Sequence, residues 1–176
     1  MRLVPISGKA GHGKDTIAGM IKAFLESNGK KILIIHYGDL VKFIAEKFFL
    51  WNGIKDEYGR TLLQKVGTDC IRKQSPNYWV DFITGVLSFF PEEWDYVLIP
   101  DARFPNEINC LKAAGYDVTH IRIVRPGFSR LTEEQQKHIS ETALDGYPAD
   151  MLVMNDGTLE DLEKKAKETA TYIMDN

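Results

Sequence analysis

A glycine-rich stretch that contains a lysine lies near the start of the sequence, SGKAGHGKDT at residues 7–16. Gly8, Gly13 and Lys14 match the pattern G-x-x-x-x-G-K, in which glycines let backbone N–H groups surround phosphate oxygens. A helix that starts after such a loop adds the positive end of its dipole, and the lysine pairs with the β- and γ-phosphates of a nucleotide. A glycine-rich turn without a ligand is the alternative. We predict a phosphate-binding loop formed by Gly8, Lys9, Ala10, Gly11, His12, Gly13, Lys14, Asp15 and Thr16.

The residue after the lysine departs from the general pattern, because Asp15 stands where a serine or threonine usually supplies a hydroxyl to Mg²⁺. A carboxylate can ligate the ion or its waters, and Thr16 offers a hydroxyl one place on. Alternatively, Asp15 simply favours the first helical turn through the helix dipole. Asp101 follows the apolar run VLIP, as a metal- or water-holding carboxylate near a γ-phosphate would, or it only ends a strand. Asp15, Thr16 and Asp101 are therefore the candidate metal ligands.

Three of the seven arginines lie where they could neutralise charge on a transferred phosphoryl group: Arg103, Arg125 and Arg130. Phosphoryl transfer is catalysed mainly by positioning and charge neutralisation, so such arginines are informative. Arg125 and Arg130 flank the start of a polar segment, about residues 126–146, which we predict to be a lid that excludes water. An ordinary solvated loop with a charged helix is the alternative. We expect Arg122, on the opposite side of its strand, to be structural.

Strands that alternate with helices would position these residues. Apolar runs predict strands in the ranges 2–7, 31–39, 94–107, 117–126 and 149–158. Helical periodicity predicts helices at 14–26, after residue 39 and after residue 107, and two more within 55–90 that are separated by a break at 75–77. A final helix is predicted from Leu159 to about Ile173, with Thr158 as its cap. The pattern predicts one α/β domain over residues 1–176, with a five-stranded parallel sheet and helices on both faces. Ligands of such sheets bind at the carboxyl ends of the strands.

Composition narrows the class of protein. The chain is 44% hydrophobic and 27% charged with a net charge of −3, which does not favour binding to nucleic acid or to anionic membranes. No apolar run approaches the roughly 20 residues of a membrane span, and the first residues do not resemble a signal peptide. Cys70 and Cys110 have no metal-type spacing. We expect a cytoplasmic, single-domain protein.

Six segments in order along the chain resemble the phage-type deoxynucleoside monophosphate kinases, a branch of the P-loop nucleoside monophosphate kinase group. They are GKAGHGKDT, YGDLVK (37–42), LLQKVGTDCIR with the later YWV, DARFPNE (101–107), HISE (138–141) and NDGT (155–158). The resemblance implies a three-layer P-loop kinase fold, ATP and Mg²⁺ as donor, and a deoxynucleoside 5′-monophosphate as acceptor. It also explains Asp15, since GKDT in place of GKST resembles that family's own loop. Related kinases are often dimers, which leaves both a monomer and a homodimer open. The resemblance implies a place in the cytoplasm, that of the host if the source is viral.

The resemblance also implies roles for single residues. The acceptor region, about residues 39–92, would use Asp39, Lys42, Gln64, Arg72, Trp79 and Arg103, with Arg72 holding the acceptor's phosphate and Arg103 lying between the two phosphates. Trp79 would offer a stacking face or pack the helices. Arg130, His138 and Glu141 would belong to the lid, and Arg125, Asn155 and Gly157 to the ATP site. Lys14, Asp101, Arg103 and Arg130 would be catalytic. Gly38 and Val41 belong to GDLVK, which stands where the family usually has ADPLK and lacks its alanine and proline, a departure that affects the acceptor pocket.

Two other functions compete with this interpretation. Another small P-loop kinase, acting on phosphomevalonate or dephospho-coenzyme A, would share the loop and the strand-end aspartate but would not need a nucleobase pocket. A nucleotide-binding switch without an acceptor would hydrolyse its nucleotide slowly, and no monophosphate would stimulate it. The guanine-reading pattern N-K-x-D is absent from the sequence, which argues against a GTP switch.

Overall fold

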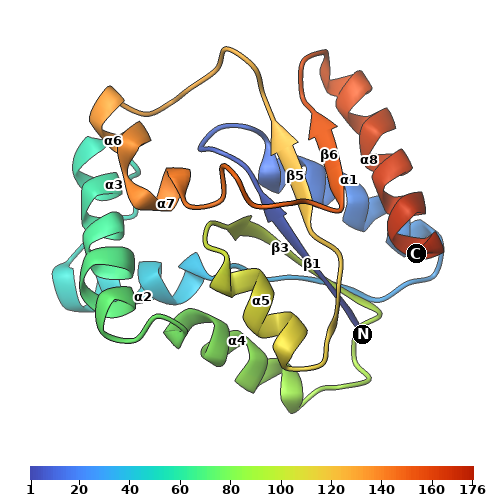
Figure 1. The fold of residues 1–176 in the computed structure, drawn as a ribbon, viewed down its shortest axis with the longest axis horizontal. Helices are drawn as coiled ribbons and strands as arrows, with labels where there is room; N and C mark the ends of the chain where they lie inside the picture. The colour runs from blue at the N-terminus through green and yellow to red at the C-terminus, as the bar shows by residue number, and fades with distance from the viewer.

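A parallel sheet forms the centre of the protein in the computed structural model, which describes residues 1–176 (Figure 1). The strands run in the order β2-β3-β1-β5-β6, with a short strand β4 that pairs with β1. Their bounds are β1 Arg2–Ser7, β2 Ile32–Ile34, β3 Tyr96–Ala102, β4 Asp117–Val118, β5 Ile121–Val124 and β6 Met151–Met154. All the pairings are parallel. The predicted five-stranded parallel sheet is confirmed, with the two-residue β4 as an addition.

Helices cover both faces of this sheet. The two helices α1 (Lys14–Ser27) and α8 (Leu159–Asp175) pack together against one face, where Ile17, Ile21 and Ala166 join a buried core with β1 and β5. The helices α2 (Gly38–Phe49), α3 (Glu57–Gln64), α4 (Tyr78–Ser88) and α5 (Asn106–Ala113) contribute to a second core with Leu3, Val97 and Ile99. The helix α3 continues directly as the π-helix η1 (Lys65–Arg72). The predicted three-layer α/β fold is confirmed.

Four of the five predicted strands are shorter in the structure, and β3 ends at Ala102 and β6 at Met154. The strand expected at 31–39 ends at Ile34, and α2 begins at Gly38. The Asp101 carboxylate accepts hydrogen bonds from the backbone amides of Tyr37 and Gly38, at 3.0 and 2.8 Å, and so satisfies two donors where α2 begins. The strand expected at 117–126 is divided into β4 and β5. The cap of the last helix is confirmed, because Thr158 and Asp161 form a reciprocal capping box.

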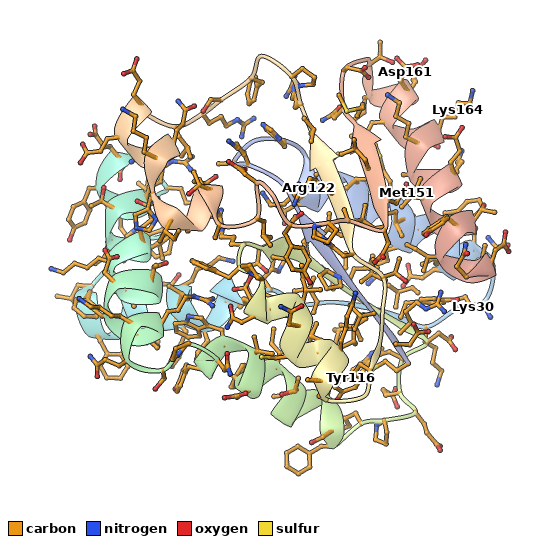
Figure 2. The ribbon with its side chains drawn as sticks, in the orientation of Figure 1. Lys30, Tyr116, Arg122, Met151, Asp161 and Lys164 are labelled. Carbon is orange, nitrogen blue, oxygen red and sulfur yellow. The ribbon has the colours of Figure 1, made fainter.

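The polar segment between β5 and β6 contains two short helices, α6 (Glu133–Lys137) and α7 (Ile139–Thr142). Arg122, on β5, holds the end of this segment by donating hydrogen bonds to the carbonyls of Leu144, Asp145 and Tyr147 (Figure 2). The structural role predicted for Arg122 is therefore confirmed. No helix combines the length and the apolar character that a membrane crossing requires, and both cysteines are free.

A tight connection joins α2 to α3 and is fixed by side chains at both ends. The buried Trp51 donates a hydrogen bond from its Nε1 to the Ile54 carbonyl at 3.0 Å. Asp56 caps α3 by accepting the Gly59 amide at 2.7 Å. Gly59 permits the close approach, because a Cβ there would overlap the Ile54 carbonyl oxygen and lie 2.7 Å from Trp51 Nε1. The position of Lys55 between these two anchors is thus set by local packing.

Replacing Gly59 with alanine is expected to lower the free energy of unfolding by about 1–3 kcal/mol, because the added methyl group forces the Trp51–Ile54 turn away from α3. Chemical denaturation measures the change. Gly85→Ala on α4 is the matched control, since a Cβ there meets open space and alanine favours a helix by about 0.5–1 kcal/mol over glycine. Equal stability changes in the two variants would contradict the packing argument.

Candidate active site

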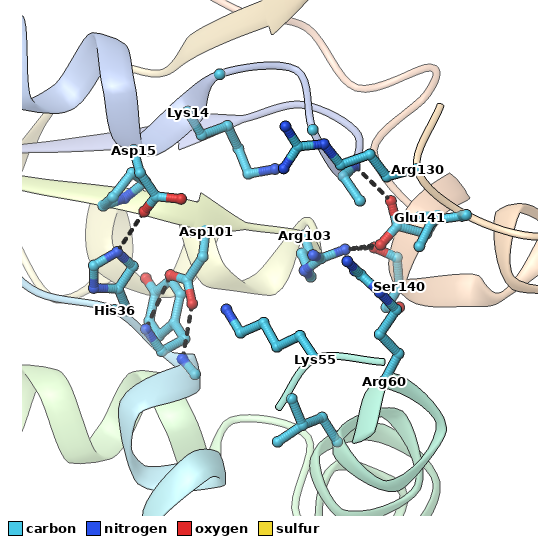
Figure 3. A pocket seen from close by; sticks show the side chains of 18 of the residues that line it. Lys14, Asp15, His36, Lys55, Arg60, Asp101, Arg103, Arg130, Ser140 and Glu141 are labelled. Atoms are coloured by element: carbon cyan, nitrogen blue, oxygen red, sulfur yellow. Dashed lines mark hydrogen bonds and ion pairs between the residues drawn. The ribbon is translucent and has the colours of Figure 1, made fainter. Parts of the chain in front are cut away.

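A cavity of about 640 Å³ opens at the carboxyl ends of the strands, between the predicted phosphate-binding loop, the end of β3, the helices α2, α3 and η1, and the polar segment (Figure 3). Most of the residues singled out in the sequence line it. They are Ala10, Gly11, Gly13, Lys14, Asp15, Thr16, Lys42, Gln64, Arg72, Trp79, Asp101, Arg103, Arg125, Arg130, Glu141, Asn155 and Gly157. Segments far apart in the sequence therefore meet at one place.

Five of the candidate residues do not line this cavity. Gly8, Lys9 and His12 lie on a smaller neighbouring cavity of about 230 Å³. Asp39 is half exposed and binds the Lys42 amino group at 2.7 Å, so it orients a cavity residue. His138 caps α7 through its Nδ1, and its Nε2 lies 3.6 Å from an Asp69 carboxylate oxygen. Asp39 and His138 are thus placed to support cavity residues from outside the cavity.

The phosphate-binding loop lies between β1 and α1 and is braced by the residues that follow β5 and β6. Gly13 has a φ of 97°, and a Cβ there would lie 2.8 Å from Asn155 Nδ2, so this position requires glycine. Asn155 donates a hydrogen bond to the His12 carbonyl at 3.0 Å, and the Arg125 amide donates to His12 Nδ1 at 3.2 Å. Burial lowers the pKa of His12, which favours the neutral ring that can accept this bond. His12 is a bracing residue of the loop.

Lys14 is buried at the base of the loop and points across it. Its amino group donates hydrogen bonds to the carbonyls of Gly8 and Lys9, at 2.6 and 3.1 Å. Burial lowers its pKa to about 8, and the positive charge of Arg103 acts in the same direction. A phosphate that entered the cavity would favour the charged amine. The loop therefore holds a desolvated cation ready for an anion.

Asp15 lies in the first turn of α1 with an exposed carboxylate that binds His36, at the end of β2. The distance from Asp15 Oδ1 to His36 Nε2 is 2.8 Å (Figure 3). This hydrogen bond lowers the pKa of Asp15 and raises the pKa of His36. The structure thus gives Asp15 a protein partner in addition to its place at the start of the helix.

Arg103 and Glu141 join the end of β3 to the polar segment. Glu141 is buried and forms an ion pair with Arg103, while its Oε2 accepts the Ala10 amide at 3.1 Å. Arg103 also donates to the Ser140 carbonyl at 3.0 Å. A single carboxylate therefore connects an arginine of the cavity with the backbone of the phosphate-binding loop (Figure 3).

Arg72 is held from several sides at the edge of the cavity. Its guanidinium pairs with the buried Glu107 and lies 4.0 Å from the centre of the Phe104 ring, while its buried Nε has no partner. Glu107 also accepts the backbone amides of Arg103 and Phe104. Burial raises the pKa of Glu107, and the charge of Arg72 counteracts this rise. Glu107 fixes both Arg72 and the chain at Arg103.

Trp79 is 2% exposed and donates from Nε1 to the Gly67 carbonyl at 3.0 Å. Of the two interpretations of this residue, packing between η1 and α4 agrees with its burial.

An aromatic ring supports two arginines of the cavity. The guanidinium of Arg125 lies 4.2 Å, and that of Arg130 5.7 Å, from the centre of the Phe128 ring. Phe128 therefore supports the two arginines at the start of the polar segment.

Sequence reasoning missed several charged residues of the cavity: His36, Lys55, Arg60 and Glu107. His36 lies within a predicted strand, and Glu107 within the DARFPNE segment, so the signals for them were present. Lys55 and Arg60 belong to no motif that assigns chemistry. Only the folding of the α2–α3 connection, which carries Lys55, and of α3, which carries Arg60, brings these two cations to the cavity (Figure 3).

The sheet order, the phosphate-binding loop and the strand-end aspartate and arginines define a protein with a P-loop kinase fold. A family model of deoxynucleotide monophosphate kinases matches residues 30–166 of the chain. The chain belongs to this family.

Two curated relatives carry the same description. The chain is 31% identical over 161 residues to the deoxynucleotide monophosphate kinase of Enterobacteria phage T4, with 90% of this chain and 61% of that protein covered. It is 30% identical over 163 residues to the one of Escherichia phage RB69, with 88% and 64% covered. The chain therefore spans less than two thirds of the length of these relatives.

A comparison with solved structures agrees on the fold. The structure of a mutant of the Mycobacterium tuberculosis APS kinase CysC has a TM-score of 0.52 and 12% sequence identity, with 98% of this chain and 96% of that chain covered. At this identity the likeness concerns the arrangement of helices and strands alone. It supports the three-layer α/β architecture.

Proposed function

We propose that this chain transfers the γ-phosphate of ATP to a deoxynucleoside 5′-monophosphate, giving ADP and a deoxynucleoside diphosphate. The observation that carries the proposal is a single cavity with the phosphate-binding loop on one wall and cations of α2, α3 and η1 on the other. Two phosphate-bearing ligands can meet in such a space. Membership of the deoxynucleotide monophosphate kinase family supports the choice of acceptor.

On the donor side, the backbone amides of the loop and Lys14 would hold the β- and γ-phosphates. Arg125, Asn155 and Gly157 lie on the same side of the cavity, where the purine and ribose of ATP would bind. Lys14 would exchange its hydrogen bonds to the Gly8 and Lys9 carbonyls for bonds to phosphate oxygens. Lys14 is charged in that state because the phosphates raise its pKa.

On the acceptor side, Lys42, Gln64 and Arg72 would contact the monophosphate. An oxygen of the acceptor phosphate attacks the γ-phosphorus, and the bond to the oxygen that bridges the β- and γ-phosphorus breaks. The attacking oxygen is already ionised, so no general base is required. Arg103 and Arg130 would neutralise the charge on the transferred group. The segment 126–146 would act as the lid that excludes water.

The residues of the cavity fit a magnesium ion. Asp15, Thr16 and Asp101 line the cavity with oxygen donors, which Mg²⁺ prefers. In phosphoryl-transfer sites Mg²⁺ is usually bound by one or two carboxylates together with substrate phosphates. When bound, the ion would neutralise charge on the phosphates. Asp101 would then combine this contact with its hydrogen bonds to the first turn of α2.

A panel of acceptors tests the proposal. The deoxy and ribo 5′-monophosphates of each base, phosphomevalonate and dephospho-coenzyme A are each mixed with ATP and Mg²⁺, and ADP release is followed. We expect at least one deoxynucleoside monophosphate to accelerate ADP release by about 100-fold over ATP alone, and mass spectrometry to find the matching diphosphate. Acceleration by phosphomevalonate or by dephospho-coenzyme A alone would point to a different small-molecule kinase. Slow release that no acceptor changes would indicate a nucleotide switch.

A further inference from the structure

Lys55 is a charged residue of the cavity without a protein partner. The other acceptor-side cations are largely committed: Lys42 to Asp39, and Arg72 to Glu107. The Lys55 amino group forms neither a hydrogen bond nor an ion pair, and Figure 3 shows its side chain extending from the α2–α3 connection into the cavity. Arg60, in the first turn of α3, likewise enters the cavity without a side-chain partner.

The position of Lys55 is fixed by its neighbours. On one side, Trp51 and Ile54 close a turn, and the Ile54 amide donates to Asn52 Oδ1 at 3.0 Å. On the other side, Asp56 caps α3. A lysine between two such anchors has its backbone held while its side chain remains free to reach a ligand. Because the backbone is already held, less conformational entropy of the backbone is lost when the Lys55 amine binds a ligand.

The charges around the Lys55 amine form an anion-binding arrangement. The residue is exposed overall, but burial around the amine and the positive charge of Lys42 lower its pKa, and Arg60 and Arg103 act in the same direction. Asp15 is the neighbouring carboxylate that opposes them. Eight lysine and arginine residues line the cavity against four carboxylates, and this excess of positive charge attracts a multiply charged anion. A phosphate dianion between Lys55, Lys42 and Arg60 would relieve their mutual repulsion.

We propose that Lys55 binds the 5′-phosphate of the acceptor nucleotide from the wall opposite the phosphate-binding loop, and so holds it toward the γ-phosphate of ATP. This inference rests on the proposed function and adds a substrate-binding residue from a segment outside all the recognised motifs. Lys14 serves the donor phosphates and Lys55 the acceptor phosphate. The two lysines therefore act on different substrates.

Steady-state kinetics of Lys55→Ala, Lys55→Arg and Lys47→Ala test this assignment. Lys47 is the matched control, an exposed lysine of α2 that does not line the cavity. For Lys55→Ala we expect the KM for the deoxynucleoside monophosphate to rise by about 10-fold or more, the loss expected for one charge-assisted hydrogen bond. The KM for ATP should change less than 2-fold, Lys55→Arg should recover most of the loss, and Lys47→Ala should match the wild type.

Equal values for Lys55→Ala and the wild type, or a rise in the KM for ATP alone, would overturn the assignment while leaving the proposed function intact. Calorimetric binding of the four deoxynucleoside monophosphates, without ATP, separates the two proposals further. Suppose that the wild type phosphorylates none of the monophosphates but binds one of them, and that Lys55→Ala weakens this binding. The proposed function then fails, and the assignment of Lys55 to a phosphate subsite remains. If the wild type binds none of them, the subsite fails too. An unchanged melting temperature of Lys55→Ala shows that any loss is not due to unfolding.

Discussion

Replacing Lys14 with alanine is expected to lower turnover by about 100- to 1000-fold, because the variant loses a preorganised cation beside the transferred phosphoryl group. The amine is buried and already oriented by the Gly8 and Lys9 carbonyls, so no other side chain can take its place in the loop. The measurement is kcat from ADP release with saturating ATP and acceptor. Lys22→Ala, at a partly exposed site on the same helix that pairs with Glu26 outside the cavity, is the control and should retain the wild-type rate.

The same variant makes a prediction about stability. The pKa of Lys14 is lowered to about 8 in the folded protein from an ordinary value of 10.5, so between these pH values the unfolded chain binds more protons. The free energy of unfolding of the ligand-free protein should therefore rise with pH across this window. Lys14→Ala should show a smaller rise over the same range. Full turnover in Lys14→Ala, or an identical pH dependence of its stability, would contradict the role given to this lysine.

Local patterns explain why much of the fold could be predicted from the sequence. The loop from Gly8 to Lys14 and the capping residue Thr158 act through neighbours in the chain, so spacing alone reveals them. The strands are continuous apolar runs because both faces of the sheet are covered. Their ends were predicted less well. The start of α2 at Gly38 depends on Asp101, which is 63 positions away in the chain.

The candidate site was predictable where a motif fixes the chemistry and less so where partners are distant. The sequence indicated Arg72 and Arg103 but not that Glu107 holds both, one through its guanidinium and the other through its backbone amide. Trp79 offered two interpretations that only its burial separates. Lys55 reaches the cavity because Gly59 lets Trp51 and Ile54 close a turn, a contact that no local pattern encodes.

Replacing Arg103 with alanine is expected to lower kcat by about 1000-fold, as expected for an arginine that stabilises charge on a phosphoryl group in transfer. Arg103 follows β3 at the centre of the cavity, and its guanidinium is held by Glu141 and the Ser140 carbonyl. The readout is kcat at saturating concentrations of both substrates, so that weaker binding does not mimic the loss. Arg2→Ala is the control, because Arg2 pairs with Asp117 at the opposite end of β1 and should leave kcat unchanged.

A double-mutant cycle with Glu141 decides how the arginine is positioned. Glu141→Gln keeps a hydrogen-bonding side chain but removes the charge that pairs with Arg103. We therefore expect kcat to fall by about 10-fold, which corresponds to about 1.4 kcal/mol for the loss of this ion pair. If Glu141 acts only through Arg103, the double variant should be no slower than Arg103→Ala alone. Losses that multiply would instead mean that Glu141 acts independently, through the Ala10 amide of the loop. The cycle thus separates an effect on the arginine from an effect on the donor site.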